Sequence, residues 1–165
     1  MSISASQVKE LREMSGVGMM ECKKALVETN GDLQQALDLL RANSSLKAEK
    51  KASRVAADGA VKVAETSAYV SLVEINSETD FAAKDTQFKD FTRAVADRLV
   101  SSQIDSIEVL NEAFDAQRQT LIQSIGENIQ LRRLSTLETS DGGCIGSYIH
   151  SDGRLAALVS LNVDN

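Results

Sequence analysis

The sequence is poor in several residue types on which protein chemistry commonly depends. Its 165 residues include one histidine, two cysteines, no tryptophan and no proline, and aromatic residues make up 4%. One histidine and no CxxC spacing give no basis for a zinc site. A Ser/His/Asp or Cys/His catalytic device would have to use His150, and nothing near it suggests its partners. The missing proline and tryptophan point to no particular function.

Patterns for phosphate binding and for membrane insertion are missing as well. The sequence contains neither GxxxxGK[ST] nor GxGxxG, the glycine-rich loops that usually cradle phosphate groups. No apolar run approaches the roughly 18 residues that a membrane-spanning helix needs. The N-terminus has neither the basic start nor the apolar stretch of a signal peptide. We therefore expect a cytoplasmic protein with no cofactor, no metal and no membrane partner.

Net charge and cysteine content indicate which partners and which cysteine redox state to expect. The chain carries 18 basic and 24 acidic side chains, a net charge of −6. An acidic chain repels phosphate backbones, so we expect no direct nucleic-acid partner. Cys22 and Cys144 lie far apart in a chain without a secretion signal and are expected to be reduced thiols. A hydrophobic content of 42% is ordinary for a globular protein, and this length can bury a self-supporting core.

The charge is unevenly distributed along the chain. Residues 1–54 have a net charge of +2, whereas residues 55–165 have a net charge of −8. This change places a predicted domain boundary near residue 54. The basic stretch 43–57 is interpreted as a solvated linker or a helix extension, with contact to an acidic partner as the alternative.

Hydrophobic periodicity predicts three short helices in the first segment. Ser4 or Ser6 can cap the first helix and Gly16 stops it, the second spans about 19–30, and Asp32 caps the third. Three short helices with glycine-containing corners predict a compact bundle. The expected inward positions are Val8, Leu11, Met14, Cys22, Ala25, Leu26, Leu33, Ala36, Leu37 and Leu40.

The remainder of the chain reads as strands, then helices, then strands. Two strands are predicted around 60–63 and 69–75, one helix over 79–101 and a second helix over 110–125, ending at Gly126. A strand follows at 129–137, and a hairpin is expected from strands 145–150 and 155–163 across a turn at 151–153. This order predicts an α+β fold with an antiparallel sheet packed with helices. The expected domains are 1–54, a core subdomain over 55–140, and the start of a second core subdomain over 141–165.

Two places look unlike plain scaffold. The first is the helix start at Met19 and Met20, because adjacent methionines cannot both point inward and methionine suits a binding surface. The alternative, that one packs and the other is incidental, stays open. The second is the run TDFAAKD, where Thr79 or Asp80 can cap a helix and Phe81 falls outside the inward stripe of that helix. An exposed phenylalanine is a good interface anchor, although spacing alone slightly favours core packing.

Four runs carry a specific resemblance. SGVGMMECKKAL, AADG, TDFAAKD and IGENIQLRR, in this order and spacing, closely resemble the bacterial translation elongation factor Ts family, and GSYIH also fits. The resemblance implies a ubiquitin-associated-like three-helix bundle followed by an α+β core. Full-length members continue well past Asn165, through the rest of a second core subdomain, a coiled-coil protrusion and a C-terminal module. We therefore expect a fragment or a short form, whose hairpin edge is left open to self-association.

The resemblance also implies a function and its residues. Members of the family promote guanine-nucleotide exchange on elongation factor Tu, binding its GDP-bound and nucleotide-free forms. The Asp-Phe pair of the motif, here Asp80 and Phe81 after Thr79, wedges beside the magnesium site of the partner. Further partner-contacting positions implied by the resemblance are Met19, Met20, Lys9, Arg12, Lys23, Gly126 and His150.

Two other function classes remain open at this stage. One is a ubiquitin-associated-type peptide- or protein-binding module joined to an unrelated α+β domain, which would not explain TDFAAKD. The other is an enzyme that uses a carboxylate pair such as Asp80 and Asp85, which no nucleophile, metal set or cofactor loop supports.

Overall fold

The computed structural model describes residues 3–162 and confirms the α+β fold, with N-terminal helices followed by an antiparallel sheet. Within these residues no helix is both long and apolar enough to cross a membrane. The chain forms two compact units, and the division runs through one helix, because Ala116–Asn128 belong with the residues up to Arg54. The elements are α1 (Ala5–Ser15), α2 (Met19–Glu28), α3 (Leu33–Lys51), β1 (Asp58–Glu65), β2 (Tyr69–Ser77), α4 (Asp80–Lys84), α5 (Thr86–Ser101), α6 (Ile107–Ile125), β3 (Gln130–Glu138), β4 (Cys144–Ile149) and β5 (Ala156–Leu161).

The first unit is built on α1, α2 and α3. Ser4 is the cap of α1, and it forms a capping box with Gln7. Asp32 caps α3 by accepting a hydrogen bond from the Gln35 amide. Within these three helices the fully buried core residues are Leu11, Cys22, Leu26 and Ala36. Met14, expected to point inward, is instead about half exposed.

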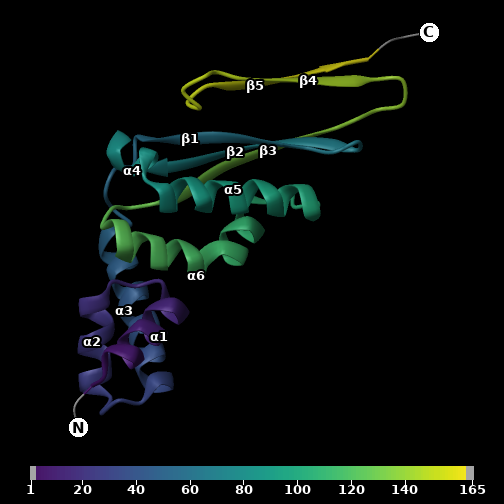
Figure 1. Ribbon diagram of the computed structural model, residues 1–165. Helices are drawn as coiled ribbons and strands as arrows, with labels where there is room; N and C mark the ends of the chain where they lie inside the picture. Colours follow the sequence, from purple (N-terminus) through teal and green to yellow (C-terminus); the bar gives the residue numbers. More distant parts are fainter. Residues whose placement is uncertain (1–2, 163–165) are drawn as a thin grey trace. The chain divides into compact units, whose positions relative to one another are not determined.

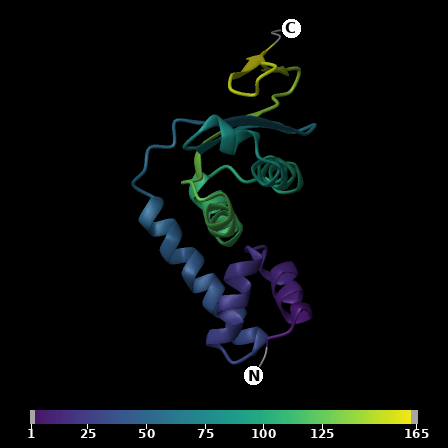
Figure 2. The same ribbon diagram turned by 60° about the vertical axis from the view of Figure 1, so that its left-hand side comes forward.

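Helix α3 extends well past Leu40, the last inward position predicted from the sequence. It continues to Lys51, so most of the predicted basic connection is helical and the helix-extension interpretation is confirmed (Figure 2). The extension packs on one side, since Ser44 and Ala48 are buried. The Ser44 hydroxyl donates to the Leu40 carbonyl and to the Gln123 side chain of α6, within the same unit. Both cysteines are free; Cys22 is buried and Cys144 exposed.

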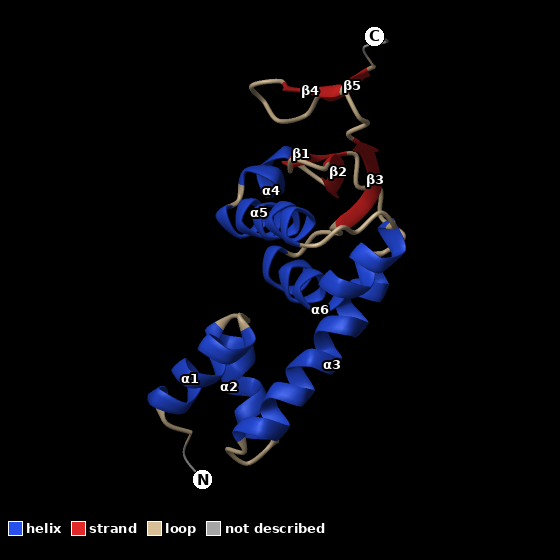
Figure 3. Cartoon of the chain, turned by 90° about the vertical axis from the view of Figure 1, so that its right-hand side faces the viewer, coloured by secondary structure: helices blue, strands red, loops and turns tan. Residues whose placement is uncertain are grey.

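The second unit is a layered arrangement around a three-stranded antiparallel sheet in the order β1-β2-β3. The central strand β2 is largely buried. Helix α5 covers one face of the sheet, and the β4–β5 hairpin lies over the other (Figure 1). The core under α5 holds Phe88, Val95 and Leu99, all fully buried. Figure 3 shows the sheet and the hairpin as separate groups of strands.

One predicted helix of this unit is divided in the structure, and one predicted strand end lies outside the described residues. The helix expected over 79–101 is two helices, α4 and α5, separated at Asp85. Asp85 has an extended ψ of 141°, and its carboxylate accepts a hydrogen bond from the Gln87 amide at 2.7 Å, which starts a new helix. The expected hairpin turn at 151–153 is present between β4 and β5, while Val163, the predicted end of the last strand, lies outside the described residues.

Candidate functional site

The short helix α4 presents an aromatic side chain to solvent. Thr79 is the cap, since its side chain accepts a hydrogen bond from the Ala82 amide at 3.3 Å. Ala82 is buried, whereas Phe81 is turned outward, with 80% of its surface exposed. Core packing of Phe81, which spacing slightly favours, is wrong. An exposed ring held on a capped helical turn is available as an interface anchor.

The carboxylate beside this ring is held in its ionised form. Lys84 donates to Asp80 Oδ2 at 2.6 Å, one helical turn along α4. That hydrogen bond, aided by the charges of Lys84 and Arg154, holds the pKa of Asp80 below its ordinary value. The tip of α4 therefore pairs an apolar ring with a carboxylate that stays charged at neutral pH.

The turn of the β4–β5 hairpin lies at the same end of the second unit. Arg154 Nη2 donates to Asp58 Oδ2 at 2.9 Å, at the start of β1, against which α4 packs. The Val61 amide donates to the Gly153 carbonyl at 2.8 Å. His150 is exposed in this turn, with Nδ1 2.9 Å from the Tyr148 hydroxyl. The hairpin turn next to His150 thus lies at the end of the sheet against which α4, with Asp80 and Phe81, packs.

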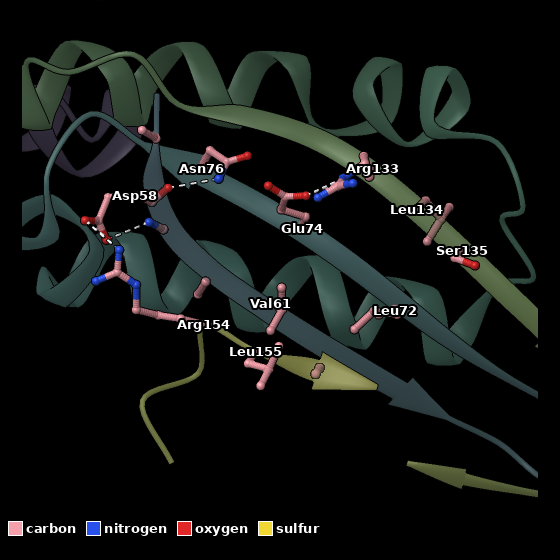
Figure 4. Close-up of a pocket in the computed structure, with 14 residues that line it drawn as sticks. Asp58, Val61, Leu72, Glu74, Asn76, Arg133, Leu134, Ser135, Arg154 and Leu155 are labelled. Carbon is pink, nitrogen blue, oxygen red and sulfur yellow. Dashed lines mark hydrogen bonds and ion pairs between the residues drawn. The ribbon is translucent and has the colours of Figure 1, made fainter. Parts of the chain in front are cut away.

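A cleft of about 520 Å³ lies between the outer face of the sheet and the start of β5, and the sequence did not reveal it. Figure 4 shows two ion pairs along it, Arg154 with Asp58 and Arg133 with Glu74. Its apolar wall includes Val61, Leu72, Leu134 and Leu155. The alternation of Leu72, Glu74 and Asn76 along β2 was a signal for this face, but the strand register and the hairpin position were needed to build the cleft.

The Glu74 ion pairs predict a specific loss of stability in acid. Partial burial raises the pKa of Glu74, but hydrogen bonds and charge from Arg133, with help from Asn76 and Arg132, outweigh it and hold the pKa below its ordinary value. A lowered folded-state pKa stabilises the fold above the ordinary value of about 4.3, and that contribution disappears as pH falls through the folded-state pKa.

Glu74→Gln should therefore lower the free energy of unfolding at pH 7 and flatten its decline between about pH 5 and pH 2. Urea unfolding across this range measures both effects. The control Glu112→Gln changes an exposed carboxylate on α6 and should follow the wild-type profile. A Glu74→Gln profile parallel to wild type would contradict the role of these ion pairs.

The methionine surface of the first unit is Met19, Met20 and Lys23 on α2. Met19 and Met20 are both exposed, at 43% and 67%, so neither is a core residue. Beside Met20 is a shallow groove of about 260 Å³, lined also by Lys23, Lys24, Val27 and Glu28. Sequence reasoning missed Lys24, Val27 and Glu28, although the three- and four-residue spacing from Met20 along α2 was a signal.

The remaining predicted partner positions, Lys9, Arg12 and Gly126, all lie in the first unit. Lys9 and Arg12 are exposed on α1, and Lys9 pairs with Glu13 at 3.8 Å. Gly126 ends α6 with a φ of 87°, and its carbonyl accepts a hydrogen bond from Lys51 Nζ at 2.5 Å, within the first unit. The carboxylates of the alternative enzyme hypothesis have structural partners, because Asp80 pairs with Lys84 and Asp85 caps α5.

Comparison with known proteins identifies the family. The family described as "Elongation factor TS" matches residues 78–165. "Elongation factor Ts" of Teredinibacter turnerae is 52% identical over 98% of this chain and 56% of its own length. The proteins of that name from Hahella chejuensis and Escherichia coli are 48% and 46% identical over 99% and 96% of this chain, and 57% and 54% of their own lengths.

The range of residues that these matches cover tests whether the second unit belongs to an unrelated α+β domain. The chain spans about half the length of the curated relatives it matches. The matched family region contains α4, α5, α6 and every strand after β2, so the second unit is not an unrelated α+β domain. The chain belongs to the elongation factor Ts family.

Proposed function

We propose that this chain acts in translation elongation as a guanine-nucleotide exchange factor, promoting GDP release from elongation factor Tu in the cytoplasm. The observation that carries the proposal is the 80% exposure of Phe81 on the capped tip of α4, in the motif that resembles the family's partner-binding wedge. Family membership supports the same role. The protein would act by binding, without covalent chemistry.

The mechanism follows from thermodynamic linkage. GDP is held by loop amides and a magnesium ion that neutralise its diphosphate. If the Asp80–Phe81 pair enters the partner beside that site, burial of the ring favours a conformation in which this neutralisation is weakened. Full burial of such a ring contributes about 1.5–3 kcal/mol. The same coupling means that GDP must weaken binding of this chain by the factor by which the chain weakens GDP binding.

This reciprocity supplies the test of the proposal. Calorimetric titration of purified elongation factor Tu with the chain should show tight binding without nucleotide and weaker binding as GDP is added. The ratio of the two affinities should equal the ratio of GDP affinities measured with and without the chain. Binding that ignores GDP would instead favour the peptide- or protein-binding module, with no exchange activity.

Residues 1–54 are proposed to act as a docking module through the methionine surface. Deleting them should weaken association while residues 55–165 keep their sheet. Leu121 and Ile122 of α6 are buried in the first unit, so deletion should also expose this segment. Circular dichroism and the same titration measure the two effects. An unfolded 55–165 fragment would show that the proposed boundary near residue 54 is misplaced.

We propose no direct nucleic-acid partner and no membrane partner, consistent with the net charge of −6. Self-association through the hairpin stays a prediction. Its apolar side chains Tyr148, Val159 and Leu161 are each more than half exposed. Such a surface suits a protein contact.

A further inference from the structure

One carboxylate in the first unit joins three helical segments. Glu21, in the first turn of α2, accepts a hydrogen bond from Lys47 Nζ of α3 on one oxygen and from Gln123 Nε2 of α6 on the other. Gln123 in turn accepts from the Ser44 hydroxyl of α3. Both carboxylate oxygens of Glu21 are thus bound by donors from different helices, a geometry that fixes α2 on α3 and on the C-terminal part of α6.

The start of α2 has no side-chain cap, so the Glu21 contact is one of the few that hold it, beside the buried Val17 and Cys22. Gly18 occupies the cap position, and no side chain there accepts from the first-turn amides. A β-carbon at Gly18 would have no neighbour within 4 Å, so packing does not hold this corner at that residue. Met19 and Met20 lie between Gly18 and Glu21. Glu21 is therefore the polar contact nearest to the two methionines that ties this turn to α3 and α6.

The hydrogen bonds to Glu21 are charge-assisted, because their acceptor is an ionised carboxylate. Partial burial raises the pKa of Glu21, but the hydrogen bonds from Lys47 and Gln123 and the charge of Lys47 outweigh it and keep the carboxylate ionised. Hydrogen bonds to an ionised acceptor are about twice as strong as those between neutral groups. This differs from the exposed pair of Arg41 and Asp38 on α3, three residues apart on one helix, which adds little.

We propose that Glu21 is a positioning residue, which orients the methionine surface through Lys47 and Gln123 and so sets how tightly the chain docks on its partner. The part concerning docking rests on the proposed function. Glu21 does not itself need to contact the partner, because its side chain is turned toward α3 and α6.

Titration and exchange assays with the full chain test the docking part. Glu21→Ala should weaken binding to GDP-bound elongation factor Tu about tenfold while leaving the maximal rate of GDP release at saturation unchanged. The exchanged pair Glu21→Lys with Lys47→Glu should restore affinity to within about threefold, since Gln123 can accept as well as donate. The control Asp38→Asn should bind like wild type. An unchanged affinity in Glu21→Ala, or an exchanged pair no better than the single variant, would overturn the proposal.

Hydrogen exchange on the chain alone tests the positioning itself. Glu21→Ala should speed amide exchange in residues 22–28 of α2, whose amides are bonded within the helix, and in residues 116–125 together, and Asp38→Asn in neither. If Glu21→Ala does not fold, Glu21→Gln serves in its place, with the same two segments affected and affinity lowered about threefold. Unchanged protection in both segments would overturn the positioning role. Failure of wild type to bind elongation factor Tu would contradict the proposed function, while this measurement still decides the role of Glu21.

Discussion

Phe81→Ala should slow stimulated GDP release by about tenfold to a hundredfold while leaving the stability of the chain nearly unchanged. The ring is 80% exposed, so its removal creates no cavity, and surface substitutions usually change stability by less than about 0.5 kcal/mol. The loss in exchange follows from the roughly 1.5–3 kcal/mol of burial that the ring would contribute in the partner. Thermal unfolding and stimulated GDP release, measured on the same preparation, give the two quantities.

A second phenylalanine provides the matched control. Phe88 is fully buried under the sheet, so Phe88→Ala should lower the free energy of unfolding by about 3–5 kcal/mol. Some binding by Phe81→Ala should survive through the methionine surface. A Phe81→Ala variant that melts far earlier, yet exchanges at the wild-type rate below its melting point, would remove Phe81 from the mechanism.

Asp80→Ala should change exchange in the same direction as Phe81→Ala but by less. The sequence left open whether Thr79 or Asp80 caps the helix, and the structure assigns the cap to Thr79. The effect of Asp80→Ala on stability is therefore small, since it removes an exposed pair with Lys84 and the attraction of Arg154.

Gly59→Ala should be the most damaging alanine substitution at a glycine, lowering the free energy of unfolding by about 3 kcal/mol or more. Gly59 has a φ of 133°, a conformation that side-chain-bearing residues rarely adopt. A β-carbon would lie 2.1 Å from the Ile75 carbonyl oxygen and 2.7 Å from Asn76 Cα. Both are backbone atoms of β2, so relief requires separating β1 from β2, where Gly59 pairs with Asn76.

Gly146 in β4 is the matched strand glycine. A β-carbon there meets nothing within 4 Å, and Gly146→Ala should change stability by less than about 0.5 kcal/mol. Thermal unfolding of both variants, followed by circular dichroism, gives the comparison. Equal melting temperatures for Gly59→Ala and wild type would mean that β1 does not approach β2 as described.

The elements that periodicity predicted well are those with one clear buried stripe. The strand β2 and the helix α5 were predicted because their buried residues recur at the spacing of a strand or a helix. Periodicity did not separate a linker from a helical extension over 43–51, because the buried Ser44 meets Gln123, 79 positions along the chain. The break at Asp85 depends on one capping hydrogen bond that periodicity does not report.

In the candidate site, too, local features could be inferred from the sequence, whereas contacts between distant residues could not. The sequence left the direction of Phe81 open, because the residue lies off the inward stripe of its helix while spacing slightly favoured core packing, and its 80% exposure decides for the outward direction. Side-chain contacts between residues far apart in the sequence could not be predicted from periodicity. The network around Glu21 joins residues 102 positions apart, and the contact of Arg154 with Asp58 joins residues 96 positions apart. Local sequence contains no signal for such pairs.

Release of a fluorescent GDP analogue from elongation factor Tu, with and without this chain, tests the central claim most directly. The proposed function predicts a release rate that rises with the concentration of the chain and saturates, with Phe81→Ala reaching a much lower plateau. Release that stays at its spontaneous rate at every concentration of a folded wild-type chain would contradict it.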